Sequence, residues 1–210
     1  MTARHAVYWV PCEDHPLWAA GVAWLASGDH RASATRYGFH ATVKAPMRLR
    51  GSEAAFAEAL SSLAKAHRPA PLPAFEVTWL RDFMALCPTA PLPVAFDALA
   101  TASVKELDGF RERPDAAERT RRIAGLDAEQ VTLYDTWGYP HLFHRWTMHL
   151  TLSDETTDPV LRRSLADVAR LHFADALAVP TGAGELAWVV EPAPGAPFHI
   201  ERRFAIGAGA

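Results

Sequence analysis

Two stretches of the chain, YGFHATVKAP at residues 37–46 and HRWTMHLTLS at residues 144–153, carry the same three-residue pattern, His-x-Thr. Side chains on a β-strand point alternately to its two faces, so residues two positions apart share a face. Each stretch therefore predicts a strand with an apolar face suited to a core and a polar face that presents a histidine beside a threonine. The polar side chains placed in this way are His40 and Thr42 in the first strand, and His149 and Thr151 in the second.

The elements that follow the two motifs repeat in the same order. Each predicted motif strand, at residues 38–45 and 145–153, is followed by a helix and then by two short strands. The first of these short strands begins 35 residues after His40 and 36 residues after His149. The predicted helices span 52–67 and 158–177, and the predicted strand pairs span 75–80 with 83–87 and 185–191 with 198–204.

This repeat predicts an α+β fold in which the whole chain, 1–210, forms one domain from a duplicated unit. We expect one lobe at about residues 5–90, connecting helices at about 91–140, and a second lobe at about 141–206. Outside the repeat, the sequence predicts a strand at 5–10, a helix at 15–27, a polar loop at 29–36, helices at 94–110 and 127–137, and a charge-dense segment at 111–122.

The composition favours a small ligand over a polymer. Half of the 210 residues are hydrophobic, 21% are charged, and the formal net charge is -3, which is ordinary for a soluble globular domain. Proteins that grip long nucleic acid through its phosphates usually carry a basic surplus, so a long nucleic-acid partner is not expected. The two cysteines have no metal-ligand spacing, and no stretch is apolar enough for a signal peptide or a membrane span. We therefore expect a cytoplasmic protein with no membrane partner.

The residues on the two polar faces suit a phosphate ester. Histidine titrates near neutral pH, so one histidine can take a proton from an attacking group while the other gives a proton to a leaving oxygen. A threonine hydroxyl can donate a hydrogen bond to a non-bridging phosphate oxygen. Lys44 and Arg145, on the same predicted faces, can neutralise charge in the transition state. Tyr37, beside the first motif, is a further candidate for substrate contact.

HATV at His40 and HLTL at His149 resemble the paired signature of the two-histidine (2H) phosphoesterase superfamily. That superfamily includes RNA 2′,3′-cyclic phosphodiesterases and bacterial enzymes first described as RNA 2′-5′ ligases. The two longer strings, with HPLW at residues 15–18, resemble a narrower branch whose genes are found in phosphonate-utilisation operons. The resemblance covers about residues 6–204.

The resemblance implies a bilobal fold with antiparallel sheets and pseudo-two-fold symmetry, in which the two motifs face each other across an active groove. It implies that His40 and His149 are the general acid and base, and that Thr42 and Thr151 bind the phosphate. It implies a small cyclic, nucleotide-linked or ribose-linked phosphodiester as the substrate, by analogy in phosphonate metabolism, with neither a metal nor another cofactor. Neither the residues nor the resemblance says which histidine is the acid.

Two alternatives to a phosphoesterase remain open at this stage. The same groove can belong to a non-catalytic protein that binds a nucleotide or a phosphonate. Alternatively, the chain can be a zinc hydrolase centred on His141, His144 and His149, since histidine is a common zinc ligand. The segment 111–122 has two interpretations of its own: a solvated helix face with internal ion pairs, or a rim that binds further phosphates of the substrate.

Overall fold

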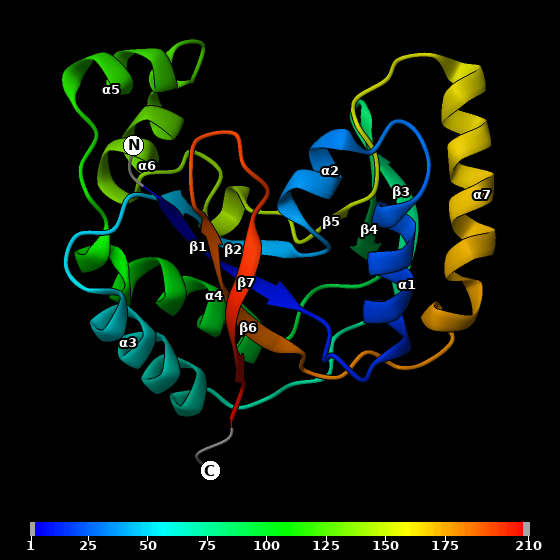
Figure 1. Cartoon of the computed structure of the whole chain (residues 1–210), viewed down its shortest axis with the longest axis horizontal. Coiled ribbons are helices and arrows are strands. Elements are labelled where there is room, and N and C mark those ends of the chain that lie inside the picture. The colour runs from blue at the N-terminus through cyan, green and yellow to red at the C-terminus, as the bar shows by residue number, and fades with distance from the viewer. Residues whose placement is uncertain (1–2, 208–210) are drawn as a thin grey trace.

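The computed structural model describes residues 3–207 and shows an α+β fold with two antiparallel sheets (Figure 1). The larger sheet has the strand order β2-β1-β6-β7 and the smaller sheet has the order β3-β4-β5. The strands are β1 (Arg4–Val10), β2 (Ala41–Met47), β3 (Phe75–Leu80), β4 (Phe83–Pro88), β5 (Leu150–Thr151), β6 (Glu185–Glu191) and β7 (His199–Ala205).

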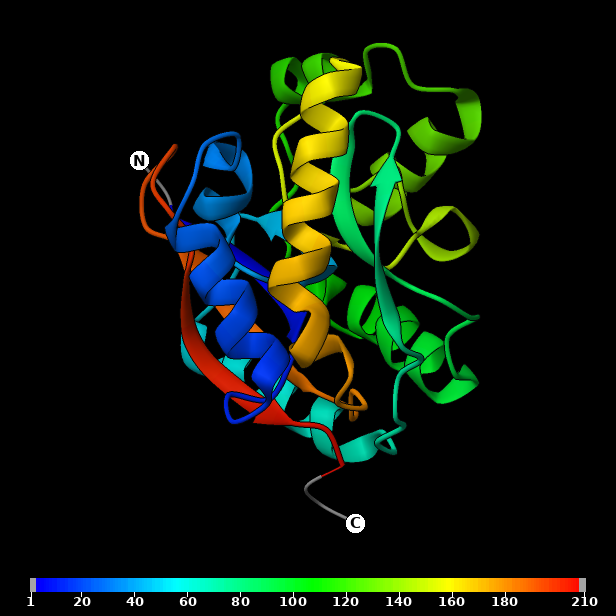
Figure 2. The same ribbon diagram turned by 90° about the vertical axis from the view of Figure 1, so that its right-hand side faces the viewer.

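Helices cover the two sheets separately. Helix α3 packs on β6 and β7 of the larger sheet, whereas α7 packs on β3 of the smaller sheet and lies beside α1 (Figure 2). Several of these helices begin at a side-chain cap, which supplies an acceptor to otherwise unpaired backbone amides; Ser52 caps α3 and Asp158 caps α7. The helices are α1 (Pro16–Ala26), α2 (Ala32–Tyr37), α3 (Glu53–Ala66), α4 (Val94–Glu106), α5 (Ala116–Ile123), α6 (Ala128–Trp137) and α7 (Pro159–Leu177), with short 3₁₀ turns η1 (Asp108–Phe110) and η2 (Phe143–Arg145).

The two repeated units exchange their strand pairs. The predicted order of strand, helix and two strands is present in both halves, as β2-α3-β3-β4 and as β5-α7-β6-β7. However, β2 and α3 lie with the strand pair β6–β7, and β5 and α7 lie with the strand pair β3–β4. Each sheet therefore takes strands from both halves of the chain, and neither sheet coincides with the residue range 5–90 or 141–206.

Strand β1 lies at the centre of the larger sheet, and both of its faces are buried. On one face, Val7 and Trp9 belong to the main core, with Phe56 and Phe173 among its largest members. On the other face, Tyr8 joins a smaller apolar cluster with Phe198. The candidate site lies on the Tyr8 face, so β1 separates that site from the main core.

The prediction of a strand over the second motif is largely wrong. Residues 145–153 form only the two-residue strand β5, preceded by the turn η2, although Met148, Leu150 and Leu152 are buried in alternation as expected. The amides of Leu152 and Ser153 both turn to the carbonyl of Met84, at 2.8 and 3.3 Å, so the regular ladder stops there. The alternating pattern correctly predicted which side chains are buried, but it did not predict the hydrogen-bond partners of the backbone.

The first motif and the segment before it also differ from the prediction. The segment 29–36, predicted to be a loop, contains most of helix α2. Gly38 ends that helix with a φ of 80°, a conformation that glycine adopts readily, and β2 begins only at Ala41. His40 therefore lies in the connection between α2 and β2. Of the helices found between residues 3 and 207, none has both the length and the apolar character needed to cross a membrane.

Candidate functional site

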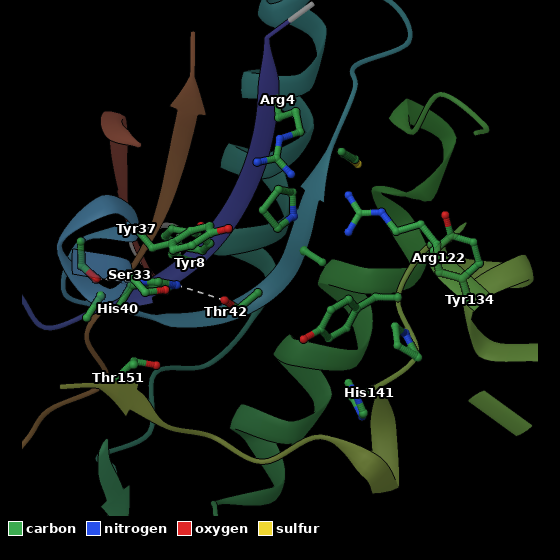
Figure 3. Close-up of a pocket in the computed structure, with 18 of the residues that line it drawn as sticks. Arg4, Tyr8, Ser33, Tyr37, His40, Thr42, Arg122, Tyr134, His141 and Thr151 are labelled. Carbon is green, nitrogen blue, oxygen red and sulfur yellow. Dashed lines mark hydrogen bonds between the residues drawn. The ribbon is translucent and has the colours of Figure 1, made fainter. Parts of the chain in front are cut away.

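A cavity of about 930 Å³ contains residues of both motifs in its walls (Figure 3). Tyr8 and Thr42 line it from the larger sheet, and Phe83 and Thr151 line it from the smaller sheet. His40 enters it from the α2–β2 connection. Its volume lies in the range of about 300–1,000 Å³ that is typical of small-molecule sites.

The two motif histidines are held by equivalent hydrogen bonds. The His40 ring nitrogen Nδ1 lies 2.9 Å from the carbonyl oxygen of Gly38, and Nδ1 of His149 lies 2.8 Å from the carbonyl oxygen of Thr147. Because a carbonyl only accepts, this contact assigns the proton of each neutral ring to Nδ1. Each histidine is thus held by the carbonyl two residues before it, and each keeps a basic lone pair on Nε2.

Burial favours the neutral form of both rings. It lowers the pKa of His40 to about 4, the Gly38 carbonyl partly opposes this shift, and a positive charge on His149 lowers the pKa further. Burial also lowers the pKa of His149. The ring of Tyr8 is stacked on His40 with 3.6 Å between ring centroids, which excludes water from one side. Both histidines are therefore neutral at pH 7 in the free protein, and a bound phosphate would raise both pKa values.

The two threonines line the same cavity. Thr42 pairs with Tyr8 across the sheet, and its hydroxyl donates to Nε2 of His40 at 3.0 Å (Figure 3). Thr151 lies on β5, opposite Ala85. His149, two residues before Thr151, packs its ring 5.5 Å from that of Phe83, another cavity residue. The structure thus brings Thr42 beside His40, whereas His149 contacts the cavity residue Phe83 but does not itself line the cavity.

Lys44 does not reach the cavity, contrary to the prediction. Across the sheet Tyr8 pairs with Thr42, but Val7 pairs with Lys44, so Val43 is an extra residue in β2. Such a β-bulge reverses the alternation beyond it. Lys44 consequently lies on the core side with Val7, where its ammonium group donates to the carbonyl of Val104 at 2.9 Å. Burial lowers its pKa to about 8.

Arg145 is also outside the cavity, and Tyr37 is inside it. The guanidinium group of Arg145 pairs with Asp127 at 2.9 Å and with Glu129 at 2.6 Å, both at the start of α6. The structure therefore does not place Arg145 where it was expected, beside the two motifs. Tyr37 lines the cavity as predicted. Its ring is stacked on that of Phe198, with 5.1 Å between centroids, and is tilted against that of His40 at 6.5 Å.

The three histidines of the zinc alternative do not come together. His144 pairs with Glu129 at 2.9 Å, whereas His141 lines the cavity against Tyr139. No group of three or more His, Cys, Asp or Glu side chains in the described part of the chain is arranged to hold a metal ion. The residues at these positions thus do not fit a zinc centre.

Several cavity residues could not be identified from the motifs. Arg4 and Tyr8 come from β1, where alternation alone cannot say which face turns toward a site. The segment 111–122 supplies Arg111, Glu118 and Arg122 to the wall, which agrees with its interpretation as a rim. Most of its charges are nevertheless paired, but with residues outside the segment and not, as the other interpretation expected, with one another. These pairs include Arg111 with Asp108, Arg119 with Asp135, and Glu112 and Glu118 with Arg48.

Comparison with known proteins gives two curated relatives, each named "Ribose 1,5-bisphosphate phosphokinase PhnN". The relative from Janthinobacterium sp. (strain Marseille) is 36% identical over 228 residues, which cover 93% of this chain and 49% of the relative. The relative from Laribacter hongkongensis (strain HLHK9) is 34% identical over 219 residues, which cover 95% of this chain and 51% of the relative. This chain therefore spans about half the length of the curated relatives it matches.

Among solved structures, Escherichia coli LigT complexed with 3′-AMP superposes on this chain with a TM-score of 0.44 and 15% sequence identity, over 98% of this chain and 99% of LigT. A family model described as "Protein of unknown function (DUF1045)" matches residues 42–199, from the threonine of the first motif to beyond the second motif. This match covers most of the chain, and the protein accordingly belongs to the DUF1045 family.

Proposed function

We propose that this protein is a phosphoesterase that hydrolyses or transfers a small cyclic, nucleotide-linked or ribose-linked phosphodiester. The observation that carries the proposal is the matched tautomer of the two motif histidines, since each Nδ1 is bound by the carbonyl two residues earlier. This tautomer leaves the basic nitrogen of each ring at Nε2, and proton transfer requires a basic nitrogen; in His40 this atom accepts from Thr42, so a substrate would have to displace that hydrogen bond. The threonines of both motifs line the same cavity and supply hydroxyl donors for phosphate oxygens.

The pair of histidines suits acid–base catalysis without a metal ligand. Burial lowers the pKa of both rings, that of His40 to about 4, and we assign His40 as the base and His149 as the acid. In this proposal His40 Nε2 takes the proton of an attacking water as its oxygen bonds to phosphorus. His149 gives its proton to the ester oxygen as the bond between phosphorus and that oxygen breaks. Thr42 and Thr151 hold the non-bridging oxygens.

The names of the relatives support a phosphorylated ribose as part of the substrate. They do not support kinase chemistry in this chain, whose sequence contains no Gly-Lys pair and hence no Gly-x4-Gly-Lys phosphate-binding loop. Because the chain spans half of each relative, the activity in their name is not transferred to it. We place the proposed hydrolysis in phosphonate metabolism on the resemblance of the motif strings.

The proposal is tested by screening 2′,3′-cyclic nucleotides and ribose cyclic phosphates for ring opening by ³¹P NMR. We expect His40→Gln and His149→Gln each to lower kcat by about 10²–10⁴. Thr42→Val and Thr151→Val should each cost about 1–3 kcal/mol in kcat/KM, the range for a hydrogen bond to a charged partner.

His144→Gln is the matched control, because His144 is exposed and pairs with Glu129 outside the cavity. It should keep wild-type activity, and activity should survive EDTA. Loss of activity in His144→Gln or on chelation would favour the zinc hydrolase. Tight binding of these ligands with no turnover would favour the non-catalytic binder.

A further inference from the structure

The part of the cavity away from the two motifs is lined by arginines, and most of their charge is already balanced. Arg48 pairs with Glu112 at 2.9 Å and with Glu118 at 2.8 Å. Arg111 pairs with Asp108 at 2.7 Å. The other two arginines in the cavity wall are Arg4 and Arg122.

Arg4 belongs to a cluster with a net positive charge. Both Arg4 and Arg36 donate to the carboxylate of Glu191, which is fully buried. The hydrogen bond from Arg4, followed by that from Arg36, lowers the pKa of Glu191 to about 2, so the carboxylate is ionised at neutral pH. Two guanidinium groups and one carboxylate leave one positive charge at the wall of the cavity.

The hydroxyl of Tyr8 is a buried donor with no protein acceptor. The side chain is 1% exposed, lines the cavity, and lies with Tyr37 above His40 (Figure 3). Its oxygen has no hydrogen-bond partner among residues 3–207. A buried hydroxyl without a partner is unfavourable, and an acceptor on a ligand in the cavity would satisfy it.

Arg122 faces this cluster from the opposite wall. It lies on α5 and is exposed, with its guanidinium group directed into the cavity (Figure 3). Within the described residues, no carboxylate lies within ion-pair distance of it. Arg121, the preceding residue on the same helix, is also exposed but does not line the cavity.

We propose that Arg122, Arg4 and the Tyr8 hydroxyl form a second anion subsite, and that the substrate is therefore a phosphodiester whose sugar carries an additional phosphate. Guanidinium groups and neutral hydroxyls are donors that phosphate oxygens accept well. The cavity of about 930 Å³ is large enough for a sugar with two phosphate groups. This inference rests on the proposed function only for the assignment of the first phosphate to the His-Thr motifs.

The test compares two adenosine ligands by calorimetry, so that it needs no turnover. We expect adenosine 3′,5′-bisphosphate to bind wild-type protein at least tenfold more tightly than adenosine 3′-monophosphate at fixed salt. Arg122→Gln should bring the ratio of the two dissociation constants close to one, whereas Arg121→Gln should leave it unchanged. Tyr8→Phe, which keeps the ring against His40, should reduce the ratio several-fold.

Equal affinities in wild-type protein, or absent binding of both ligands, would overturn the second subsite. An equal loss in Arg121→Gln and Arg122→Gln would also overturn it, because it would show a general effect of charge on the helix. If the protein prefers the bisphosphate but turns over no cyclic ester, the second subsite is supported and the phosphoesterase proposal is contradicted. If the protein turns over a cyclic ester but does not prefer the bisphosphate, the phosphoesterase proposal is supported and the second subsite is contradicted.

Discussion

His40 combines the basic nitrogen Nε2, to which the Thr42 hydroxyl donates, with an environment that resists protonation of the ring. The Gly38 carbonyl fixes Nδ1–H, and the ring of Tyr8 covers one face of the imidazole. In the unfolded chain a histidine titrates near ~6.5, whereas in the folded protein the pKa of His40 is about 4. The unfolded state therefore binds this proton first as the pH falls.

We expect this difference to make the protein less stable in acid. Stability is retained above pH ~6.5 and is lost as the pH falls from there to about 4, by at most about 3 kcal/mol at 1.36 kcal/mol per pKa unit. The figure is an upper limit because the ring is partly exposed to solvent. Urea unfolding at a series of pH values measures the loss, and His40→Gln should flatten it. A mutant curve parallel to that of the wild type would place the titrating group elsewhere.

Among the secondary-structure elements, β2 shows how one extra residue decides which side chains reach the site. The bulge at Val43 leaves Thr42 facing the cavity and turns Lys44 toward α4. Asp108, the carboxylate near Lys44, is also held by Arg111 at 2.7 Å. Removal of the lysine charge would therefore not leave an unpaired carboxylate.

We expect Lys44→Met to keep kcat within twofold of wild type and to change the melting temperature by only a few degrees. Replacement of a buried charge by an apolar side chain of similar length is often neutral or stabilising when no partner is stranded. Steady-state kinetics and thermal unfolding would check this, with Arg145→Gln as a second variant outside the cavity. A tenfold fall in kcat with an unchanged melting temperature would mean that Lys44 contacts the substrate after all.

The sequence predicted elements better than it predicted their partners. The bounds of β3 follow from alternating apolar residues, those of β6 follow from a continuous apolar run, and the order of elements in both units follows from the repeat. Alternation cannot show that β6 pairs with β1, since pairing depends on contacts between distant segments. For the same reason it missed the bulge at Val43 and the cavity-facing side of Tyr8. The six-residue helix α2 is too short and polar to give a periodic signal.

At the scale of the whole molecule, the exchanged strand pairs make the two halves of the chain dependent on each other. Strand β6 pairs with β1 along its entire length, from Arg4 opposite Glu191 to Val10 opposite Glu185. A fragment that ends before β6 leaves the buried strand β1 without one of its two neighbours. Unpaired buried backbone groups are costly, so neither half has a complete sheet.

We expect fragments 1–140 and 141–210 to be largely unfolded when they are produced separately. Circular dichroism and the spread of amide signals in NMR would measure this, with the full chain as the control. A cooperative unfolding transition in fragment 1–140 alone would show that the larger sheet does not need β6 and β7.

The separation of β1 and β6 in the sequence also fixes how long β1 waits for its partner during synthesis. Strand β6 leaves the ribosome about 180 residues after its partner β1. At the usual synthesis rate of about 5–20 residues per second, that interval lasts roughly 10–40 seconds. Throughout that interval, one edge of an apolar strand has no partner. Unpaired strand edges invite association with other chains. The yield of folded protein in a cell should therefore depend on how fast the segment between β1 and β6 is translated.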